Sequence, residues 1–331
     1  MAINETTDVT QNTTSTLYDN VFNGIVYLEA LLIITGNTLT FVAVKQTKKL
    51  REIPTNVFIL GLAASDGVIG LMTPIFITLR FLKIEDAWSG TVCVLYGPHF
   101  SMFWISLLTL LAIAVDRYIA VVQPLSYRQR ITTKRAKIIS VAIWIVAFSL
   151  ITSLTCLFGS FGVGSTAVRI VFPKQVSMFF LQIIIFGPVL GNIIIYICIY
   201  INLKKKQSVV FDGTRANSEG THRSTSRTTK AYVNMMALVL VYLLIACVPN
   251  YILQAVSKQL QTSKPEWFVY ISNLSVILFY SNSFMNPVIY SWKNRNFHQA
   301  YKNILLCNRS SGIRSEDSIC DGSRTENRST V

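Results

Sequence analysis

Charged residues are scarce in this chain. They make up 14% of its 331 residues, whereas hydrophobic residues make up 51%. Apolar runs recur along the whole length, and each is close to the roughly 20 helical residues that cross a bilayer core. These features exclude a large soluble helical protein and predict an all-α membrane protein, a bundle of seven transmembrane helices. The predicted spans cover about residues 22–44, 56–82, 93–122, 136–159, 175–203, 231–257 and 267–292.

Two further features are missing from the sequence. The first 20 residues contain no basic segment followed by an apolar core, so we expect no cleaved signal peptide. The chain also has no internal repeat, and Asp66 is the one acid that we expect to be deeply buried. A transporter or a channel would need repeated halves or a continuous polar path, so both classes are disfavoured.

Acidic residues are outnumbered by basic ones, 16 to 30, which gives a net charge of +14. The basic residues gather on one side of the predicted spans, in segments 45–51, 128–137, 204–230 and 293–328. Because Lys and Arg mark the cytoplasmic side, this pattern predicts a multi-pass plasma-membrane protein with an extracellular amino terminus. Anionic membrane lipid is the expected neighbour of these bases, and no nucleic-acid partner is expected.

This topology divides the chain into three parts. Residues 1–20 form an extracellular glycosylated tail, residues 21–307 form the seven-helix bundle plus a short amphipathic eighth helix, and residues 308–331 form a disordered cytoplasmic tail. Asn4 and Asn12 each begin an Asn-x-Thr triplet, which is an acceptor for glycosylation. An extracellular amino terminus would make both acceptors usable.

The triplet Asp116-Arg117-Tyr118 interrupts the apolar run from Leu107 to Val122. Charged side chains at that position are costly if lipid surrounds them. We therefore expect the triplet to lie inside the bundle or at its cytoplasmic mouth, and to be functional.

One landmark residue in every predicted span makes this chain similar to the rhodopsin-like (class A) G-protein-coupled receptors, over about residues 20–307. The landmarks are Asn37, Asp66, Arg117, Trp144, Pro188 with Tyr196, Pro249, and Asn286-Pro287-Val288-Ile289-Tyr290. The resemblance implies a receptor that transmits the binding of an extracellular ligand to a heterotrimeric G protein. It implies no enzymatic activity.

In this family the arginine is released from its neighbouring acid on activation and then meets the G protein. The resemblance assigns that switch to Asp116, Arg117, Tyr118, Leu125, Tyr196, Asn286, Pro287 and Tyr290. Many members also clamp the arginine with an acid at the start of the sixth helix, but Thr229 stands there. We therefore expect this second clamp to be absent.

Asp66 resembles the acid of the family's sodium pocket. A buried carboxyl group must be protonated or must hold a cation. By the family pattern, the other oxygen donors would be Ser106, Asn282, Ser283 and Asn286, and a sodium ion would act as an allosteric ligand. A hydrogen-bonded polar cluster without an ion is the alternative.

The chain departs from the family pattern in its sixth helix and in its cysteines. Cys247 replaces the usual tryptophan two residues before Pro249, which leaves the trigger beneath the ligand in doubt. No cysteine lies between Cys156 and Cys198, where the family's usual disulfide has its second partner. Cys93 can pair with Cys156 if the fourth helix ends early, and two free thiols are the favoured alternative.

The predicted ligand pocket lacks two diagnostic residues. His99 stands where amine receptors have an aspartate, and Tyr280 stands where opsins have the Schiff-base lysine. The pocket residues implied by the resemblance are His99, Phe100, Phe103, Cys247, Asn250, Tyr251, Gln254, Val276 and Tyr280. This aromatic lining suits a small, uncharged or weakly polar ligand, and segments 133–137 and 282–287 look most like adenosine and amine receptors.

Two other functions stay open. A receptor for a short basic peptide is one, because Glu85, Asp86 and Glu266 could meet such a peptide at the rim. A non-signalling scavenger receptor of the same fold is the other, because the sixth helix is altered.

The cytoplasmic end contains the remaining motifs. Phe297, Tyr301, Ile304 and Leu305 recur at helical spacing, which predicts an amphipathic helix on the inner leaflet, and Cys307 after it is a candidate for palmitoylation. The loop from Thr214 to Thr229 and the tail are rich in Ser and Thr. We expect both to be disordered and, once phosphorylated, to bind arrestin-type proteins. The last residues have the form of a PDZ ligand: Ser329, Thr330 and Val331.

Overall fold

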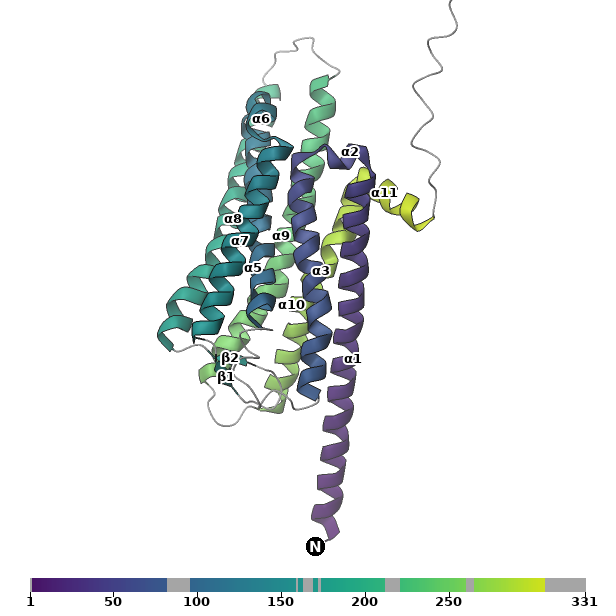
Figure 1. The fold of residues 1–331 in the computed structure, drawn as a ribbon, viewed down its shortest axis with the longest axis vertical. Coiled ribbons are helices and arrows are strands. Elements are labelled where there is room, and N and C mark those ends of the chain that lie inside the picture. Colours follow the sequence, from purple (N-terminus) through teal and green to yellow (C-terminus); the bar gives the residue numbers. More distant parts are fainter. Residues whose placement is uncertain are drawn as a thin grey trace, which may run out of the picture.

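Seven long helices form the body of the molecule (Figure 1). The computed structural model describes residues 2–81, 96–158, 160–162, 169–171, 174–211, 221–259 and 265–306. Within these residues, seven helical stretches are long and apolar enough to cross a membrane. The predicted seven-helix membrane fold is therefore confirmed. The long helices are α1 (Ala2–Gln46), α3 (Pro54–Phe81), α5 (Gly97–Val122), α7 (Thr133–Phe158), α8 (Lys174–Phe211), α9 (Thr221–Gln259) and α10 (Glu266–Lys293).

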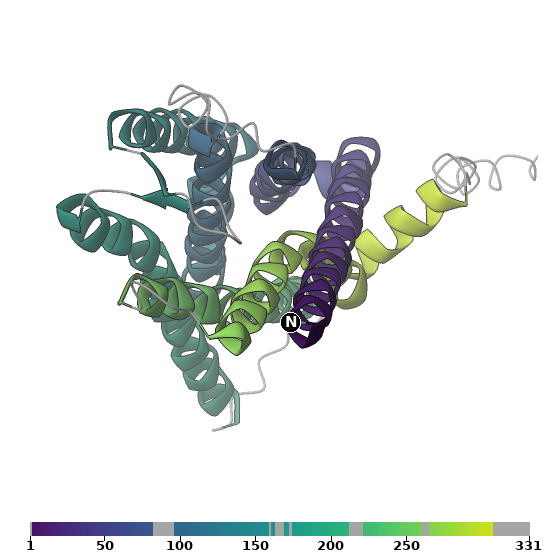
Figure 2. The same cartoon turned by 90° about the horizontal axis from the view of Figure 1, so that it is seen from below.

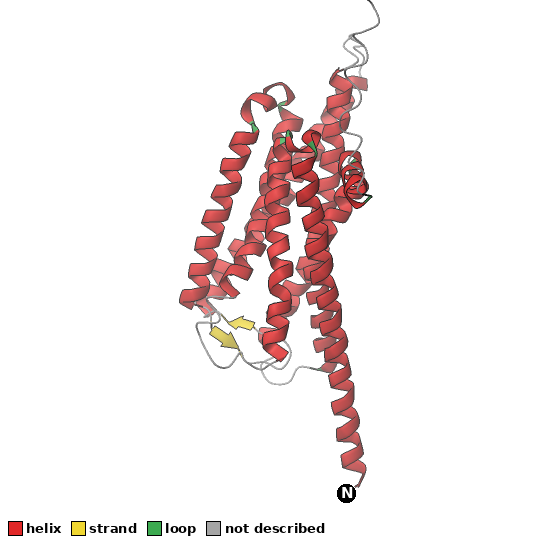
Figure 3. Ribbon diagram, turned by 45° about the vertical axis from the view of Figure 1, so that its right-hand side comes forward, coloured by secondary structure: helices red, strands yellow, loops and turns green. Residues whose placement is uncertain are grey.

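The short elements lie at the two ends of the bundle. Helices α2 (Lys48–Arg51), α6 (Pro124–Arg130) and α11 (Arg295–Leu305) lie at one end, which we call the Arg117 end. Strands β1 (Ser160–Gly162) and β2 (Arg169–Val171) pair antiparallel at the other end (Figure 3), with Phe161 opposite Ile170. Viewed along the bundle, the long helices surround a common centre and α11 leads away from it (Figure 2).

Helix α1 shows how the sequence directs one face toward the bundle. Its buried side chains Val26, Ala30, Ile33 and Asn37 recur every three or four residues, which places them on one helical stripe. Asn37 Nδ2 donates to the Ile33 carbonyl at 2.9 Å and to the Ser283 carbonyl at 3.0 Å, so it joins α1 to α10.

A glycine permits this close approach. A Cβ atom on Gly36 would lie 3.2 Å from Cγ of Pro287 in α10, which is closer than most real side-chain contacts. Small residues let membrane helices pack closely where lipid supplies no hydrophobic drive between them. Gly36 and Asn37 thus position the α10 segment that contains Asn286 and Pro287.

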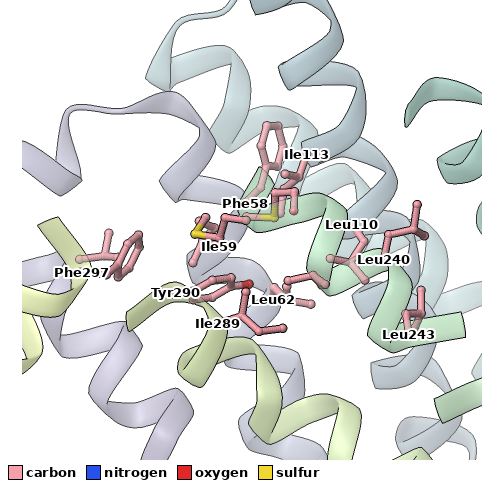
Figure 4. Close-up of a cluster of buried hydrophobic side chains, with 14 of the residues drawn as sticks. Phe58, Ile59, Leu62, Leu110, Ile113, Leu240, Leu243, Ile289, Tyr290 and Phe297 are labelled. Atoms are coloured by element: carbon pink, nitrogen blue, oxygen red, sulfur yellow. The ribbon is translucent and has the colours of Figure 1, made fainter. Parts of the chain in front are cut away.

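The largest hydrophobic cluster lies at the Arg117 end, where α3, α5, α9 and α10 meet (Figure 4). It contains Phe58, Leu62, Leu110, Leu243 and Tyr290, all of which are buried. Large apolar side chains on the outer faces, such as Ile145 and Leu190, are instead exposed. An apolar outer surface of this kind is the expected result when a bilayer is the solvent.

Helix α11 confirms the predicted amphipathic helix but divides its apolar residues between two directions. Phe297 and Tyr301 are buried against the bundle, and the Tyr301 hydroxyl lies 2.7 Å from Thr40 Oγ1 in α1. Leu305 is 70% exposed and points away from the protein's core. The helix is therefore attached to the bundle by its first turns, and its last turn presents apolar surface.

One segment differs from the sequence prediction. The loop from Thr214 to Thr229 was expected to be disordered, but residues 221–229 form the first turns of α9. The prediction is wrong there because the helix continues beyond its apolar span through polar residues that are compatible with helix. Residues 2–16 continue α1 beyond the bundle (Figure 1).

Candidate functional site

Arg117 lies at the centre of a closed polar network at the Arg117 end. Its Nε and Nη2 atoms donate to Asp116 Oδ2 at 3.0 and 2.6 Å, and this contact is an ion pair. Nη2 also donates to the Thr55 hydroxyl and, at 2.9 Å, to the Tyr127 hydroxyl. Both charged side chains are buried. The site therefore holds a cation and an anion away from water, with every contact within hydrogen-bonding reach.

Asp116 is held from three sides. Thr55 Oγ1 at the start of α3 donates to Asp116 Oδ2 at 2.6 Å, and the Tyr127 hydroxyl in α6 donates to Oδ1 at 2.8 Å. A buried ion pair is tolerated when further hydrogen bonds satisfy its remaining atoms. Thr55 and Tyr127 provide these bonds and thereby join α3 and α6 to the end of α5.

Tyr127 can serve as a permanent donor. Burial raises the pKa of its phenol to about 12, so the hydroxyl keeps its proton at physiological pH. The Arg117 guanidinium also lies 5.7 Å from the centre of the Tyr127 ring, which allows a cation–π contact. Sequence reasoning missed the roles of Thr55 and Tyr127, because neither lies next to Arg117 in the chain and neither position is unusual for its residue type.

The other residues predicted for the switch surround this network without joining it. Tyr118 packs with Tyr196 against the buried Val121, Ile199 and Val233. Leu125 is 81% exposed at the start of α6. A large apolar side chain with that exposure, beside a polar network, is available to a partner.

Tyr290 and its neighbours form a separate layer. Tyr290 is buried, its ring centre lies 5.5 Å from that of Phe297, and its hydroxyl has no hydrogen-bond partner among the described residues. A buried hydroxyl without a partner is costly. The arrangement leaves Tyr290 free to gain a partner if α10 moves.

Asp66 forms a second buried polar cluster, deeper in the bundle. Its Oδ1 accepts from the Ser106 and Ser283 hydroxyls at 2.9 and 3.2 Å, and its Oδ2 accepts from Asn286 Nδ2 at 2.9 Å. The structure thus brings together four of the five predicted residues. Asn282 is also buried, but its Oδ1 has no hydrogen-bond partner among the described residues.

The predicted ligand-pocket residues contribute to a chain of aromatic rings across α3, α5, α8, α9 and α10. Phe103 and Phe279 have ring centres 4.6 Å apart, and Tyr251 meets Phe279 edge-on at 6.4 Å. The Tyr280 hydroxyl lies 3.4 Å from His99 Nε2, and Tyr280 also contacts Phe279 at 5.7 Å between ring centres.

Phe279 is the pocket residue that sequence reasoning missed. Like Phe103 and Tyr251, it is partly buried and packs against the hydrophobic cluster that contains the buried Cys247. Where the family pattern has a tryptophan, this chain therefore has a small thiol on α9 and an aromatic ring contributed by α10. An aromatic residue one position before Tyr280 was a usable signal, but only the packing shows which way it points.

The remaining pocket predictions have different outcomes. Asn250 is buried, Val276 is partly buried, and Phe100 is 38% exposed, so Phe100 is the least enclosed of the set. The side chain of Gln254 lies outside the described part of the structure, as do the side chains of Asn4 and Asn12.

The cysteines correct one expectation. Cys156 is disulfide-bonded, so the favoured alternative of two free thiols is wrong for this residue. Its predicted partner Cys93 lies outside the described residues, and the pairing stays a prediction. Cys307 and the terminal triplet Ser329, Thr330 and Val331 also lie outside them.

Sequence comparison adds a family to this geometry. The family described as "7 transmembrane receptor (rhodopsin family)" matches residues 36–290. The somatostatin receptor type 2 of Mus musculus is 26% identical over 330 residues, which cover 96% of this chain and 85% of the relative. The adenosine receptors A2b of Bos taurus and Homo sapiens are each 27% identical, over 308 and 310 residues. These matches cover 87% and 84% of this chain, and 90% and 89% of the respective relatives.

The residues that match the family include the Arg117 network and the Asp66 cluster. The relatives are receptors and not enzymes, which agrees with the absence of enzymatic activity inferred from the sequence. With seven apolar spans, these two polar clusters and a match over most of its length, the chain belongs to the rhodopsin family of seven-transmembrane receptors.

Proposed function

We propose that this receptor transmits the binding of an extracellular ligand to a heterotrimeric G protein at its Arg117 end. The observation that carries the proposal is the closed network in which Asp116, Thr55 and Tyr127 hold Arg117. A fixed cation that is fully paired at rest can act as a switch when the pairing is exchanged.

The proposed switch consists of a change of partners. At rest, the guanidinium is held by the three residues above. When the helices move, Arg117 leaves Asp116 and contacts the G protein beside the exposed Leu125, and Tyr196 and Tyr290 stabilise the open arrangement. The intact network argues against the alternative of a non-signalling scavenger receptor, in which this contact would have no use.

The charge distribution supports an extracellular amino terminus. The Arg117 end carries an excess of basic residues, which the positive-inside rule places in the cytoplasm. Those with described side chains are Lys45, Lys48, Lys49, Arg51, Arg130, Lys134, Arg135, Lys137, Lys204, Lys293, Arg295 and Lys302. This orientation puts the aromatic pocket on the extracellular side, and the plasma membrane is the proposed location.

A small molecule is the proposed ligand class, because the aromatic rings from Phe103 to Tyr280 are mostly enclosed. The relatives are named for somatostatin and for adenosine. A peptide is therefore the second candidate, and the exposed Glu266 at the outer end of α10 favours a basic one.

A sodium ion is a proposed allosteric ligand at the Asp66 cluster. The donor set consists of oxygen atoms from Asp66, Ser106 and Ser283, and hard cations prefer such ligands. Asp66 would supply the negative charge. Arrestin-type proteins and a PDZ protein at the last three residues remain proposed partners.

The test is a ligand screen in cells that carry sensors for dissociation of each G-protein class. A hit in the wild type should disappear with Arg117→Ala and persist with Lys134→Ala, which removes an exposed base at the same end. A response that Arg117→Ala leaves unchanged would contradict the proposed mechanism. Receptor at the cell surface is quantified for each variant, so that loss of folding is not mistaken for loss of coupling.

A further inference from the structure

A second buried acid lies in the outer half of the bundle, away from the Arg117 network and the Asp66 cluster. Glu29 on α1 is 6% exposed, and its Oε2 has no hydrogen-bond partner among the described residues. No described residue forms an ion pair with it. Ionisable side chains inside a membrane span are costly and mark functional positions, yet neither the resemblance nor the predicted pocket includes Glu29.

The position of Glu29 is set by the buried stripe of α1. It stands next to Ala30 and eight residues before Asn37, which corresponds to about 12 Å along a helix. The side chain thus faces the bundle, on the amino-terminal side of Asn37. This side is the one that we propose to be extracellular.

Tyr280 connects Glu29 to the pocket. Glu29 lies close enough to Tyr280 to act on it electrostatically, and Thr73 is within hydrogen-bonding reach of the Tyr280 hydroxyl. The same hydroxyl lies 3.4 Å from His99 Nε2. His99 is 8% exposed, and its other nitrogen, Nδ1, has no partner among the described residues. This polar cluster therefore contains two buried atoms that have no hydrogen-bond partner among the described residues, Glu29 Oε2 and His99 Nδ1.

Aromatic rings pack around the His99 end of this cluster. Phe76 meets the His99 ring edge-on at 4.7 Å and stacks on Tyr96 at 4.5 Å between ring centres, while Phe100 lies 6.2 Å from His99. An acid combined with aromatic faces is the environment that recognises a cation. A buried carboxyl group without a counter-charge is protonated, so a cation is the ligand group that would keep Glu29 ionised, and an anion would be repelled.

We infer that Glu29, Thr73, His99 and Tyr280 form a subsite for a cationic group of the ligand, a primary ammonium or a guanidinium. Glu29 supplies the counter-charge to the cation. Tyr280 and Thr73 hold the polar groups around the Glu29 carboxylate in place, and His99 Nδ1 offers the ligand a further hydrogen bond. This inference deepens the proposed receptor function and changes the expected ligand from uncharged to basic. In amine receptors the acid stands at the position of His99 on α5, whereas here the acid is Glu29 on α1.

The test uses a charged probe and a neutral probe of the same shape, phenylguanidine and phenylurea. Each is titrated into the purified full-length receptor in lipid nanodiscs, and thermal unfolding is followed. Phenylguanidine should raise the Tm of the wild type in a saturable way, and phenylurea should not. Glu29→Gln should weaken phenylguanidine binding by about 10- to 100-fold, the effect of losing a hydrogen bond to a charged group. Glu52→Gln, which neutralises an exposed acid at the Arg117 end, far from this subsite, should leave binding unchanged.

The inference is overturned if phenylguanidine fails to bind the wild type at millimolar concentration, or if both probes bind equally. It is also overturned if Glu29→Gln binds phenylguanidine as well as the wild type does. The comparison of the two probes on the wild type decides the matter even if Glu29→Gln does not fold. Because no G protein is present, failure here leaves coupling intact, and failure of coupling would not affect this binding measurement.

Discussion

Replacing Asp116 by Asn removes the negative charge that holds Arg117 and keeps the size of the side chain. Arg117 donates two hydrogen bonds to Asp116 Oδ2, whereas its bonds to Thr55 and Tyr127 can persist. Hydrogen bonds to charged groups contribute about 1.5–3 kcal/mol each. Since the amide oxygen of Asn still accepts, we take the loss at the low end, about 1.5 kcal/mol.

This loss shifts the balance between the resting and the open arrangement. About 1.4 kcal/mol corresponds to a tenfold change in an equilibrium. A minor open state populated to about 1% would rise to about 10%. We therefore expect Asp116→Asn to raise basal G-protein dissociation roughly tenfold per receptor at the cell surface.

The assay compares basal sensor signals at matched surface expression. Glu52→Gln, which neutralises an exposed acid at the same end of the bundle, is the control and should behave as the wild type. Adding Arg117→Ala to Asp116→Asn should abolish the increase. Equal basal signals for Asp116→Asn and the wild type would refute the role of Asp116 as the restraint on Arg117.

Three further predictions concern Tyr127, the Asp66 cluster and Phe279. Tyr127→Phe should raise basal activity less than Asp116→Asn does. The raised pKa of about 12 keeps the Tyr127 phenol neutral. The contribution of this hydroxyl to Tm should therefore be complete below the phenol's unfolded-state pKa of about 10 and should be lost only above that pH. A difference between wild type and Tyr127→Phe that changes between pH 6 and 9 would contradict this. Sodium should raise the Tm of the wild type relative to choline, by the linkage of binding to stability, and equal sodium dependence in Asp66→Asn would remove the ion from the account. Phe279→Ala should lower the Tm and weaken any ligand response, since it deletes the ring between Phe103 and Tyr251; aromatic pairs contribute about 0.5–1.5 kcal/mol beyond their buried area, and an unchanged response would show that the pocket signals by another route.

The seven-helix fold could be predicted from the sequence because the transmembrane spans are recognised from hydropathy alone. The seven spans follow from run length, and Asp66, Ser106, Ser283 and Asn286 were grouped by family pattern before the structure showed their contacts. The start of α9 was not predicted, because hydropathy gives no signal there. Polar residues 221–229 carry no hydrophobic signal, although they continue a helix.

The site was only partly accessible. Asp116 and Arg117 are adjacent in the chain, so their pairing could be read directly. Thr55 and Tyr127 come from other helices, and no local pattern marks them as partners of Arg117. Asp66 was expected to be the one deeply buried acid, and this expectation was wrong because Glu29 and Asp116 are buried as well. The burial of Glu29 depends on how α1 is rotated, which its apolar run does not reveal.

The sequence by itself determined the membrane fold, its spans and the charge pair that serves as the proposed output switch, because apolar length and adjacent charges are local properties. Only the tertiary structure decided which side chains complete each polar cluster and that Phe279 packs against Phe103 and Tyr251. It alone also showed that Glu29 is buried and within electrostatic range of Tyr280. The physical reason is that these contacts join residues from different helices, and their distances are fixed by the packing of whole helices against one another.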